Sequence, residues 1–403
     1  MNGPRRRVGT EERRARLGVR HLLAPAHHVG RMQDVARALI GLHATDPSTV
    51  FLAAAARTGH PDIAAMEGEL YEERALERML CMRRTMFVVP ADLAPVVEAS
   101  TSRAIAARER AACAVHLRDG AGWSQERYEA VEAEVLAALA VRGEAGAAQL
   151  ADDVPALREQ VTVSAGKPYE ARQAVSWRIL RVLAAEGRIR RGRPAGAFNS
   201  NQFRWTLSTL ADAAGTWETG EAKQELARRY LAAFGPVTTE DLAWWTGWTL
   251  TDTRRAITAT GAQPVELDEG AGHLLPDDFD PVTAPEPWVA LLPGLDPTAM
   301  GWRHRHFYLD PAHVPELYDR NGNIGPTVWA DGRIVGAWAQ QPSGRINTHL
   351  LTDPGPSARA ALCARAEELA SWLGDLRITP HYRTPLERRL AQAADGSPPR
   401  GGG

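Results

Sequence analysis

The sequence lacks the long apolar run that a membrane-spanning helix needs. Nowhere in its 403 residues do uncharged apolar residues approach the ~18 required. Three consecutive arginines stand near the N-terminus without an apolar segment behind them, so we expect no secretory signal. The only cysteines, Cys81, Cys113 and Cys363, lie far apart, which excludes a disulfide framework and gives no zinc signature. These absences favour a cytoplasmic protein.

Motifs of nucleotide-dependent enzymes and serine hydrolases are missing as well. The sequence has no GxGxxG in a strand–turn–helix setting, no Walker A loop and no GxSxG elbow. The adjacent histidines His27 and His28 have no Asp or Glu at ligand spacing, so we predict a loop there rather than a metal site. We therefore expect no metal and no nucleotide or other cofactor.

The charge is nearly balanced overall but strongly separated along the chain. The net charge is −2, yet residues 158–205 hold ten basic residues against three acidic ones, a net +7, and residues 251–300 have a net −7. Such a distribution can present one basic face to a polyanion such as DNA. Two oppositely charged, solvated surfaces would produce the same pattern.

The middle of the chain repeats one order of elements. Two amphipathic helices flank a short helix and are followed by two strand-like segments, which is the order of a winged helix-turn-helix. The segments are Ser124–Val141, Ala147–Leu150, Tyr169–Glu186, Arg188–Arg191 and Gln202–Leu207. The order recurs in helices at Glu221–Phe234, from Thr239 to Gly247 and at Thr251–Thr260, with a hairpin at Gln263–Leu275.

The two ends of the chain complete the prediction. Helices are expected at Glu11–Leu22, Arg31–Leu42 and from the Asp46 cap to Arg57, then strands at Arg78–Cys81 and Thr85–Val89 and a helix over Ala91–Leu117. Strand-like segments follow at Trp288–Leu292, Thr327–Ala330 and Arg333–Ala339, with an Asp-Gly turn between the last two and a helix over Ala358–Leu373.

We therefore predict an α+β fold of tandem winged helix-turn-helix domains with a C-terminal β-rich domain. The expected divisions are a first winged-helix domain over 8–120, a second over 121–215 and a third over 216–280. A β-rich domain over 281–390 and a disordered tail over 391–403 complete the chain.

Four strings resemble the AlkZ/YcaQ-like DNA glycosylases, a bacterial winged-helix family that excises alkylated bases. Leu42-His-Ala-Thr-Asp-Pro47 is similar to the family's Leu-Gln-x-Gln/Asp-x-Pro motif, and the run Met82–Pro90 matches a second segment. The strings Leu291–Trp302 and Asp319–Pro326 are longer and more specific. The resemblance covers about residues 18–380 and implies tandem winged helices closed by a β-rich domain. Its motif places His43 and Thr45 where the family has Gln and Gln or Asp.

These two side chains suit hydrolysis of an N-glycosidic bond. An alkylated base is already cationic and leaves readily, so what remains is to position a water and stabilise charge on the sugar. A neutral imidazole of His43 can accept a proton from the water, and the Thr45 hydroxyl can orient it. The pair shares one side only if the segment is extended. Capping alone explains Asp46, and a lone His between helices is often structural.

Arginine clusters are the candidate DNA contacts. Arg188, Arg190, Arg191 and Arg193 lie in a predicted wing, and Arg83 and Arg84 lie at the tip of another, near His43. For the alternating His304 and His306, a solvated stretch competes with phosphate contact. Trp244, Trp245 and Trp248 favour a core position over a stacking platform.

The resemblance implies a monofunctional DNA glycosylase that acts on double-stranded DNA carrying alkylated purines. N7-alkylguanine, N3-alkyladenine and bulky antibiotic adducts are the candidate substrates. By analogy with relatives, and from the Ala-, Gly- and Arg-rich composition, a role in antibiotic self-resistance follows. No lysine stands near the motif to form a Schiff base, so no lyase step is expected. We expect a monomer associated with the nucleoid. The alternative is a non-catalytic winged-helix DNA-binding protein, either a transcription regulator or a damage sensor.

Overall fold

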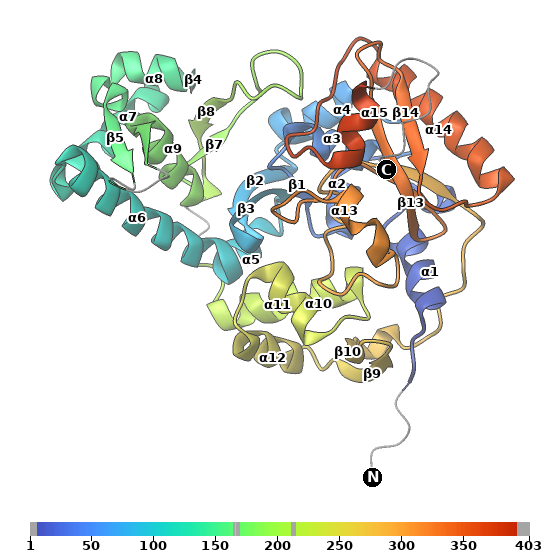
Figure 1. Cartoon of the computed structure of the whole chain (residues 1–403). Coiled ribbons are helices and arrows are strands. Elements are labelled where there is room, and N and C mark those ends of the chain that lie inside the picture. The colour runs from blue at the N-terminus through green and yellow to red at the C-terminus, as the bar shows by residue number, and fades with distance from the viewer. Residues whose placement is uncertain (1–5, 164–165, 167–169, 211–214, 393–403) are drawn as a thin grey trace.

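The computed structural model describes residues 6–163, 166, 170–210 and 215–392 of the chain. Helices and several small antiparallel sheets form an α+β fold, in which a lobe built from α6–α9 and β4–β8 projects from a larger body (Figure 1). Most of the predicted disordered tail, residues 393–403, lies outside the described residues.

The N-terminal segment folds around a three-stranded sheet in the order β1-β3-β2. Its elements are α1 Thr10–Arg20, α2 Met32–Ala38, β1 Leu42–His43, α3 Pro47–Ala55, α4 Ile63–Glu67, β2 Leu76–Cys81 and β3 Thr85–Pro90. The prediction that the helix starting at Arg31 extends to Leu42 was wrong at its C-terminal end. It stops at Ala38 because Ile40 takes a positive φ of 66°, after which the chain turns into the sheet.

The second segment has the predicted winged-helix order, with one correction. Its elements are α5 Ala94–Val97, α6 Arg103–Ala121, α7 Gln125–Arg142, β4 Glu144–Gly146, α8 Ala147–Asp153, β5 Gln160–Val163, β6 Ala171–Ala174, α9 Val175–Ala185, β7 Ile189–Arg191 and β8 Arg204–Leu207. The helix expected from Tyr169 begins only at Val175. Residues 171–174 instead pair antiparallel with the preceding strand β5, a pairing that helical periodicity does not reveal.

The third segment has the predicted order of three helices and a hairpin, and its middle helix begins and ends where the sequence predicted. It contains α10 Thr219–Phe234, α11 Thr239–Thr246, α12 Leu250–Ala259, β9 Gln263–Leu267 and β10 Gly270–Leu274. A reciprocal capping box between Thr238 and Asp241 starts α11, and Gly247 ends it in the left-handed conformation at φ 80°. β9 and β10 pair antiparallel, which confirms the expected hairpin.

The C-terminal segment is built on the four-stranded sheet β11-β12-β13-β14. Its elements are β11 Val289–Leu292, α13 Val314–Leu317, β12 Thr327–Ala330, β13 Arg333–Gln340, β14 Ile346–Leu350, α14 Pro356–Leu373 and α15 Pro385–Gln392. Asp331 and Gly332 both take positive φ between β12 and β13, which confirms the Asp-Gly hairpin turn.

A buried ion pair joins the N-terminal segment to the C-terminal one. The guanidinium of Arg57, just after α3, donates to both carboxylate oxygens of Asp296 at 2.7 and 2.9 Å, and neither side chain is exposed. Arg57 also donates to Thr298 Oγ1 at 2.9 Å, and the same hydroxyl lies 2.8 Å from Nδ1 of the buried His21. The loop after β11 is therefore fixed against the end of α1 and the end of α3, and the motif segment lies between these two helices in the sequence.

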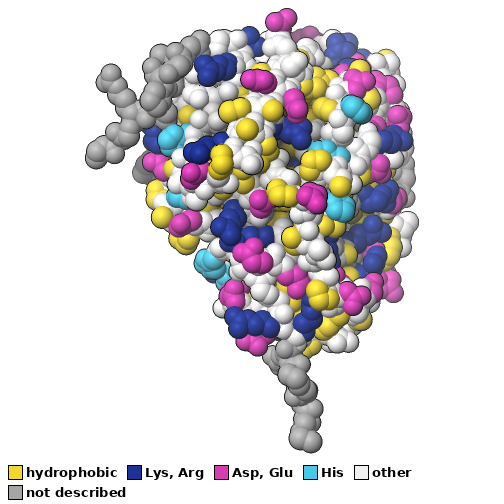
Figure 2. All heavy atoms as spheres, turned by 90° about the vertical axis from the view of Figure 1, so that its right-hand side faces the viewer, with side chains coloured by type: hydrophobic (Ala, Val, Ile, Leu, Met, Phe, Trp, Pro, Cys, Tyr) yellow, Lys and Arg dark blue, Asp and Glu magenta, His cyan; other side chains and the backbone are white. Residues whose placement is uncertain are grey.

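Charges that are separated along the sequence are paired in space. Acidic residues of 251–300 meet arginines of the N-terminal segment, for example Asp278 with Arg16 at 2.8 Å. The basic window finds acids outside itself, as in Arg190 with Glu77 at 3.0 Å. On the face in Figure 2, basic and acidic side chains are interspersed. Within the described residues, no helix is both long and apolar enough to span a membrane.

Candidate active site

An extended segment holds His43 and Thr45 on the same side of the chain. β1 pairs with β3 so that His43 lies opposite Phe87, and the Ala44 N–H donates to the Met86 carbonyl at 2.8 Å. Residues two apart in an extended chain point the same way, and both side chains line one cavity. The geometric condition for a joint role of the pair is met.

This cavity, which we call the His43 cavity, has a volume of about 380 Å³ and is assembled from distant parts of the chain. Arg83 and Thr85 come from the β2–β3 turn, and Trp244 comes from α11. The rest of the lining lies in the C-terminal segment: Leu295, Met300, Arg305, Asn321, Gly322, Asn323 and Tyr382. No carboxylate is among these lining residues.

The imidazole of His43 is neutral at physiological pH. Its side chain is buried, and burial, with a smaller contribution from the charge of Arg83, lowers its pKa to about 3. Neither its Nδ1 nor the Thr45 Oγ1 has a hydrogen-bond partner within the described structure. Buried polar atoms are nearly always satisfied, so two such atoms in one cavity indicate a place for a bound polar group.

Two guanidinium groups lie against the ring of Trp244 at the same cavity. The Arg83 guanidinium carbon is 4.1 Å from the Trp244 ring centroid and that of Arg305 is 4.9 Å away. Both terminal nitrogens of Arg83 are buried without a hydrogen-bond partner in the described residues. Burial and the charge of Arg305 lower the pKa of Arg83 to about 10, which still leaves it protonated at pH 7. The cavity is therefore cationic and suited to an anion.

Asp46 is fully occupied as a helix cap. One carboxylate oxygen accepts from the Ser48 N–H at 2.9 Å, and the other accepts from the His381 N–H at 2.8 Å. This explains why α3 starts where it does, directly after Thr45.

The other predicted DNA-binding arginines form ion pairs within the protein, with one exception. Arg84 pairs with Glu109, and Arg190 with Glu77. Arg188 lies 3.6 Å from Glu132, and Arg193 pairs with Glu67 and Glu72. The exception, Arg191, lies over the Phe203 ring at 3.9 Å from its centroid. Of the six predicted arginines, only Arg83 lines the His43 cavity.

The remaining candidates occupy different environments. His27 lies in a short helical turn at Pro25–His27, and the described residues contain no cluster of His, Cys, Asp or Glu fit for a metal. His304 and His306 lie in a loop with ring centroids 6.3 Å apart. Trp245 is buried in the core as predicted, whereas Trp244 borders the cavity.

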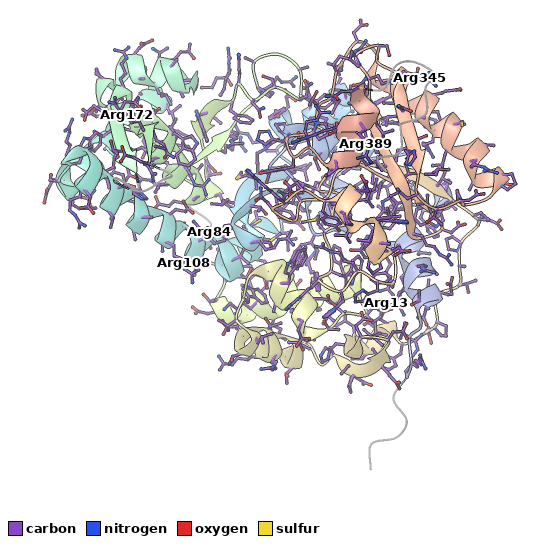
Figure 3. All side chains as sticks on the ribbon, viewed as in Figure 1. Arg13, Arg84, Arg108, Arg172, Arg345 and Arg389 are labelled. Atoms are coloured by element: carbon purple, nitrogen blue, oxygen red, sulfur yellow. The ribbon has the colours of Figure 1, made fainter. Side chains whose placement is uncertain are left out.

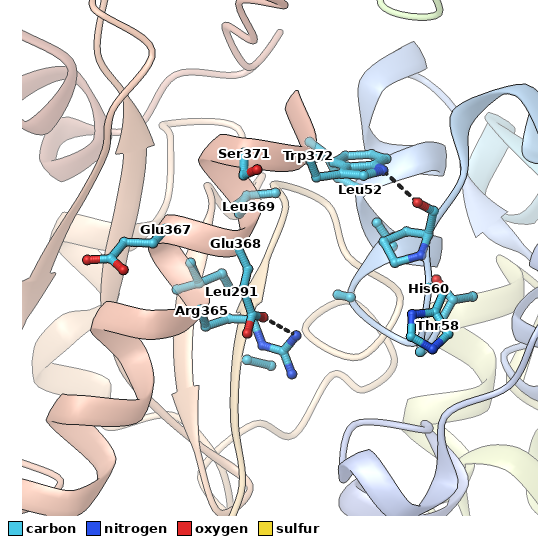
Figure 4. Close-up of a pocket in the computed structure, with 15 residues that line it drawn as sticks. Leu52, Thr58, His60, Leu291, Arg365, Glu367, Glu368, Leu369, Ser371 and Trp372 are labelled. Carbon is cyan, nitrogen blue, oxygen red and sulfur yellow. Dashed lines mark hydrogen bonds and ion pairs between the residues drawn. The ribbon is translucent and has the colours of Figure 1, made fainter. Parts of the chain in front are cut away.

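A further cavity of about 650 Å³ lies between α3 and α14 (Figure 4). Arg365 is ion-paired with Glu368 at 2.8 Å, and the Trp372 indole donates to the Pro61 carbonyl at 3.1 Å. None of the sequence-predicted site residues lines it.

Comparison with known proteins points to one family. A family model described as DNA glycosylase AlkZ-like matches residues 36–372, which is most of the chain. The chain belongs to the AlkZ-like DNA glycosylase family. Its fold is similar to that of Streptomyces sahachiroi DNA glycosylase AlkZ, with a TM-score of 0.70 and 22% identity over 92% of this chain and 98% of that chain. No match was found among curated proteins.

Sequence reasoning missed part of the cavity of this AlkZ-like glycosylase. Trp244 was assigned to the core, and Asn321, Asn323 and Tyr382 were not singled out. A signal was present, because Asn321 and Asn323 lie in the string Asp319–Pro326 that carries the family resemblance. The structure brings Asn321 and Asn323 of this string to the cavity that His43 and Thr45 line.

Proposed function

We propose that the protein is a monofunctional DNA glycosylase that hydrolyses the N-glycosidic bond of alkylated purines, with His43 and Thr45 holding the water. The observation that carries this proposal is the pair of unsatisfied atoms, His43 Nδ1 and Thr45 Oγ1, in one cavity of an AlkZ-like glycosylase. N7-alkylguanine, N3-alkyladenine and bulky antibiotic adducts are the substrates to test, the last bearing on self-resistance. A monomer acting on duplex DNA is our working state.

In the reaction, the bond between the sugar C1′ and the base nitrogen breaks and the base leaves with the electron pair. A water oxygen then bonds to C1′ and loses a proton, which yields an abasic site. Neutral His43 accepts a hydrogen bond from this water. The Thr45 hydroxyl makes a second hydrogen bond to the water and so fixes its orientation. Because the pKa of His43 is about 3, the imidazole orients the water and passes its proton to solvent rather than retaining it.

The two guanidiniums fit the phosphates that flank the damaged nucleotide. Arg83 and Arg305 border the same cavity, and Arg83 has terminal nitrogens without partners in the described residues. Phosphates bound there would place C1′ near His43. Their negative charge would stabilise the positive charge that develops on the sugar. A charged His43 would add a third cation, so its neutrality is consistent with this arrangement.

The scarcity of lysine supports the proposal that no lyase step follows base release. The chain has two lysines, Lys167 and Lys223, and Lys223, the one among the described residues, does not line the His43 cavity. Lys223 is paired with Asp252 at 3.1 Å. A Schiff base with the abasic sugar needs an amine within reach, so we propose hydrolysis alone.

The experiment is a base-release assay on DNA carrying N7-methylguanine, 3-methyladenine or a bulky N7-guanine adduct, with abasic sites scored by alkaline cleavage. We expect His43→Ala and Thr45→Val to lower the rate by about 10²-fold or more, as for loss of a water-positioning group. His60→Ala and Thr251→Val alter exposed residues outside this cavity and serve as matched controls. Duplex binding is measured for every variant.

Base release that survives both His43→Ala and Thr45→Val would refute the assignment of the water-handling residues. Duplex binding without base release from any of the three substrates would refute the glycosylase. A non-catalytic DNA-binding protein would then be the function to pursue. Strand cleavage without alkali would contradict the monofunctional chemistry.

A further inference from the structure

A third and larger cavity lies between the β2–β3 hairpin and the projecting lobe. It has a volume of about 810 Å³, within the ~300–1,000 Å³ typical of ligand pockets. Arg78 and Met86 border it from the hairpin, and residues of α9, β7 and β8 line it from the projecting lobe. No residue lines both this cavity and the His43 cavity, so we call it the lobe cavity.

Two arginines of the lobe cavity have no acidic partner within the described residues, Arg78 and Arg191. Nη1 of Arg78 is buried and makes no hydrogen bond there. Burial, followed by the charge of Arg78, lowers the pKa of Arg191 to about 10, so Arg191 remains protonated at pH 7. Burial also lowers the pKa of Arg78, and arginine side chains stay protonated in proteins. The neighbouring Arg190 and Arg181 are instead paired, with Glu77 at 3.0 Å and Glu109 at 2.9 Å. Two uncompensated like charges in one cavity are costly unless an anion joins them.

Aromatic surfaces accompany these cations. The Arg191 guanidinium carbon lies 3.9 Å from the Phe203 ring centroid and 5.6 Å from that of Trp205. Trp177 on α9 also lines the cavity, and it is 53% exposed, which is unusual for so large an apolar side chain. An accessible indole offers a flat face on which a base can stack.

We propose that the lobe cavity binds a nucleotide, with its phosphate between Arg78 and Arg191 and its base stacked on Trp177. A phosphate accounts for the unpaired cations, and a flat base accounts for the exposed indole. The exposed amides of Asn201 and Gln202 at the rim can donate to and accept from a base edge. The nucleotide is either an unpaired residue of a DNA strand or a free nucleoside monophosphate. The site is separate from the chemistry proposed at His43.

The experiment measures binding by the full-length protein. Deoxyadenosine monophosphate is titrated by calorimetry, and a labelled deoxyadenosine hexamer by fluorescence anisotropy. We expect saturable binding that weakens about tenfold in Arg78→Gln, Arg191→Gln and Trp177→Ala, as for loss of one phosphate contact or one stacking partner. Arg172→Gln changes an exposed arginine on β6 of the same lobe (Figure 3) and should stay within about twofold. His43→Ala should bind both probes like the wild type, which separates this test from base release.

The outcomes are distinct. Binding of the hexamer alone supports the site and assigns it to a DNA strand, whereas binding of the monophosphate alone assigns it to a free nucleotide. Absence of binding for both probes overturns the proposal, as does binding that none of the three variants weakens. Equal competition by inorganic phosphate also overturns it, because the base would then contribute nothing. Trp177→Ala changes an exposed residue, so the test holds even where an arginine variant fails to fold.

Discussion

Acidification from pH 7 to pH 5 should destabilise the folded protein through two buried imidazoles. The pKa values of His21 and His43 are both lowered to about 3, chiefly by burial, whereas an unfolded histidine titrates near ~6.5. Below pH 6.5 the unfolded chain therefore binds protons that the native protein does not. The contribution of each neutral imidazole to stability is present above pH 6.5 and is lost as the pH falls toward 3.

The magnitude follows from the two pKa values. A pH of 5 is about 1.5 units below the pKa of the imidazole in the unfolded chain, so that imidazole is protonated, whereas the imidazole in the native protein is still neutral. Protonation of the unfolded state then lowers the free energy of unfolding by about 2 kcal/mol for each residue, or about 4 kcal/mol for the two together.

Urea unfolding of the wild type and of His43→Gln at both pH values tests this reasoning. Glutamine has the hydrogen-bonding groups of the family motif and does not titrate. The wild type should lose about 2 kcal/mol more than the variant between pH 7 and pH 5. His60→Gln, at an exposed histidine, should behave like the wild type. Equal losses in wild type and His43→Gln would show that His43 titrates normally, and the neutral imidazole of the proposed mechanism would be refuted.

Three further predictions concern other parts of the molecule. Asp296→Asn, which leaves the buried Arg57 uncompensated, should lower stability by about 3–5 kcal/mol. Asp353→Asn is the control, because Asp353 pairs with Arg359 at an exposed position, and it should lower stability by no more than about 1 kcal/mol. Thermal denaturation measures both variants, and equal shifts in their melting temperatures would contradict the importance of burial. Arg83→Met should weaken duplex binding at all sequences and reduce the slope of log affinity against log salt by about 0.9; an unchanged slope would show that Arg83 meets no phosphate. Gly336→Ala should lower stability by about 1–3 kcal/mol, because a Cβ there collides with the backbone of β14, and a neutral result in urea unfolding would show that the strand yields.

Features governed by neighbouring residues could be predicted from the sequence. The Asp46 cap, the start of α11 at Thr239 and its end at Gly247, and the Asp331-Gly332 turn each depend on interactions within a few residues. His43 and Thr45 can share one side only if their segment is extended, and the pairing of β1 with β3 makes it extended.

Features governed by distant contacts could not be predicted. Segment 171–174 is a nearer case: it has helical periodicity but pairs with the preceding strand β5, and this strand pairing overrides the helical pattern. The wing arginines appeared free for DNA because their acidic partners are remote in the sequence, Arg193 meeting Glu67 and Glu72. Trp244 and Arg305 join the cavity of His43 only through the packing of the third and C-terminal segments on the first.

The ion pair between Arg57 and Asp296 also limits how this protein can diverge. Each side chain is fully buried, and each alone would be an uncompensated charge in the core. A lineage that loses one partner first passes through a poorly folded intermediate, whereas simultaneous replacement by two apolar residues requires two rare events. The carbonyls of His21 and Ala53, which also accept from Arg57, raise the barrier further. Among homologues that share this core, the two positions should be inherited as a unit, 239 residues apart, and change together when they change at all.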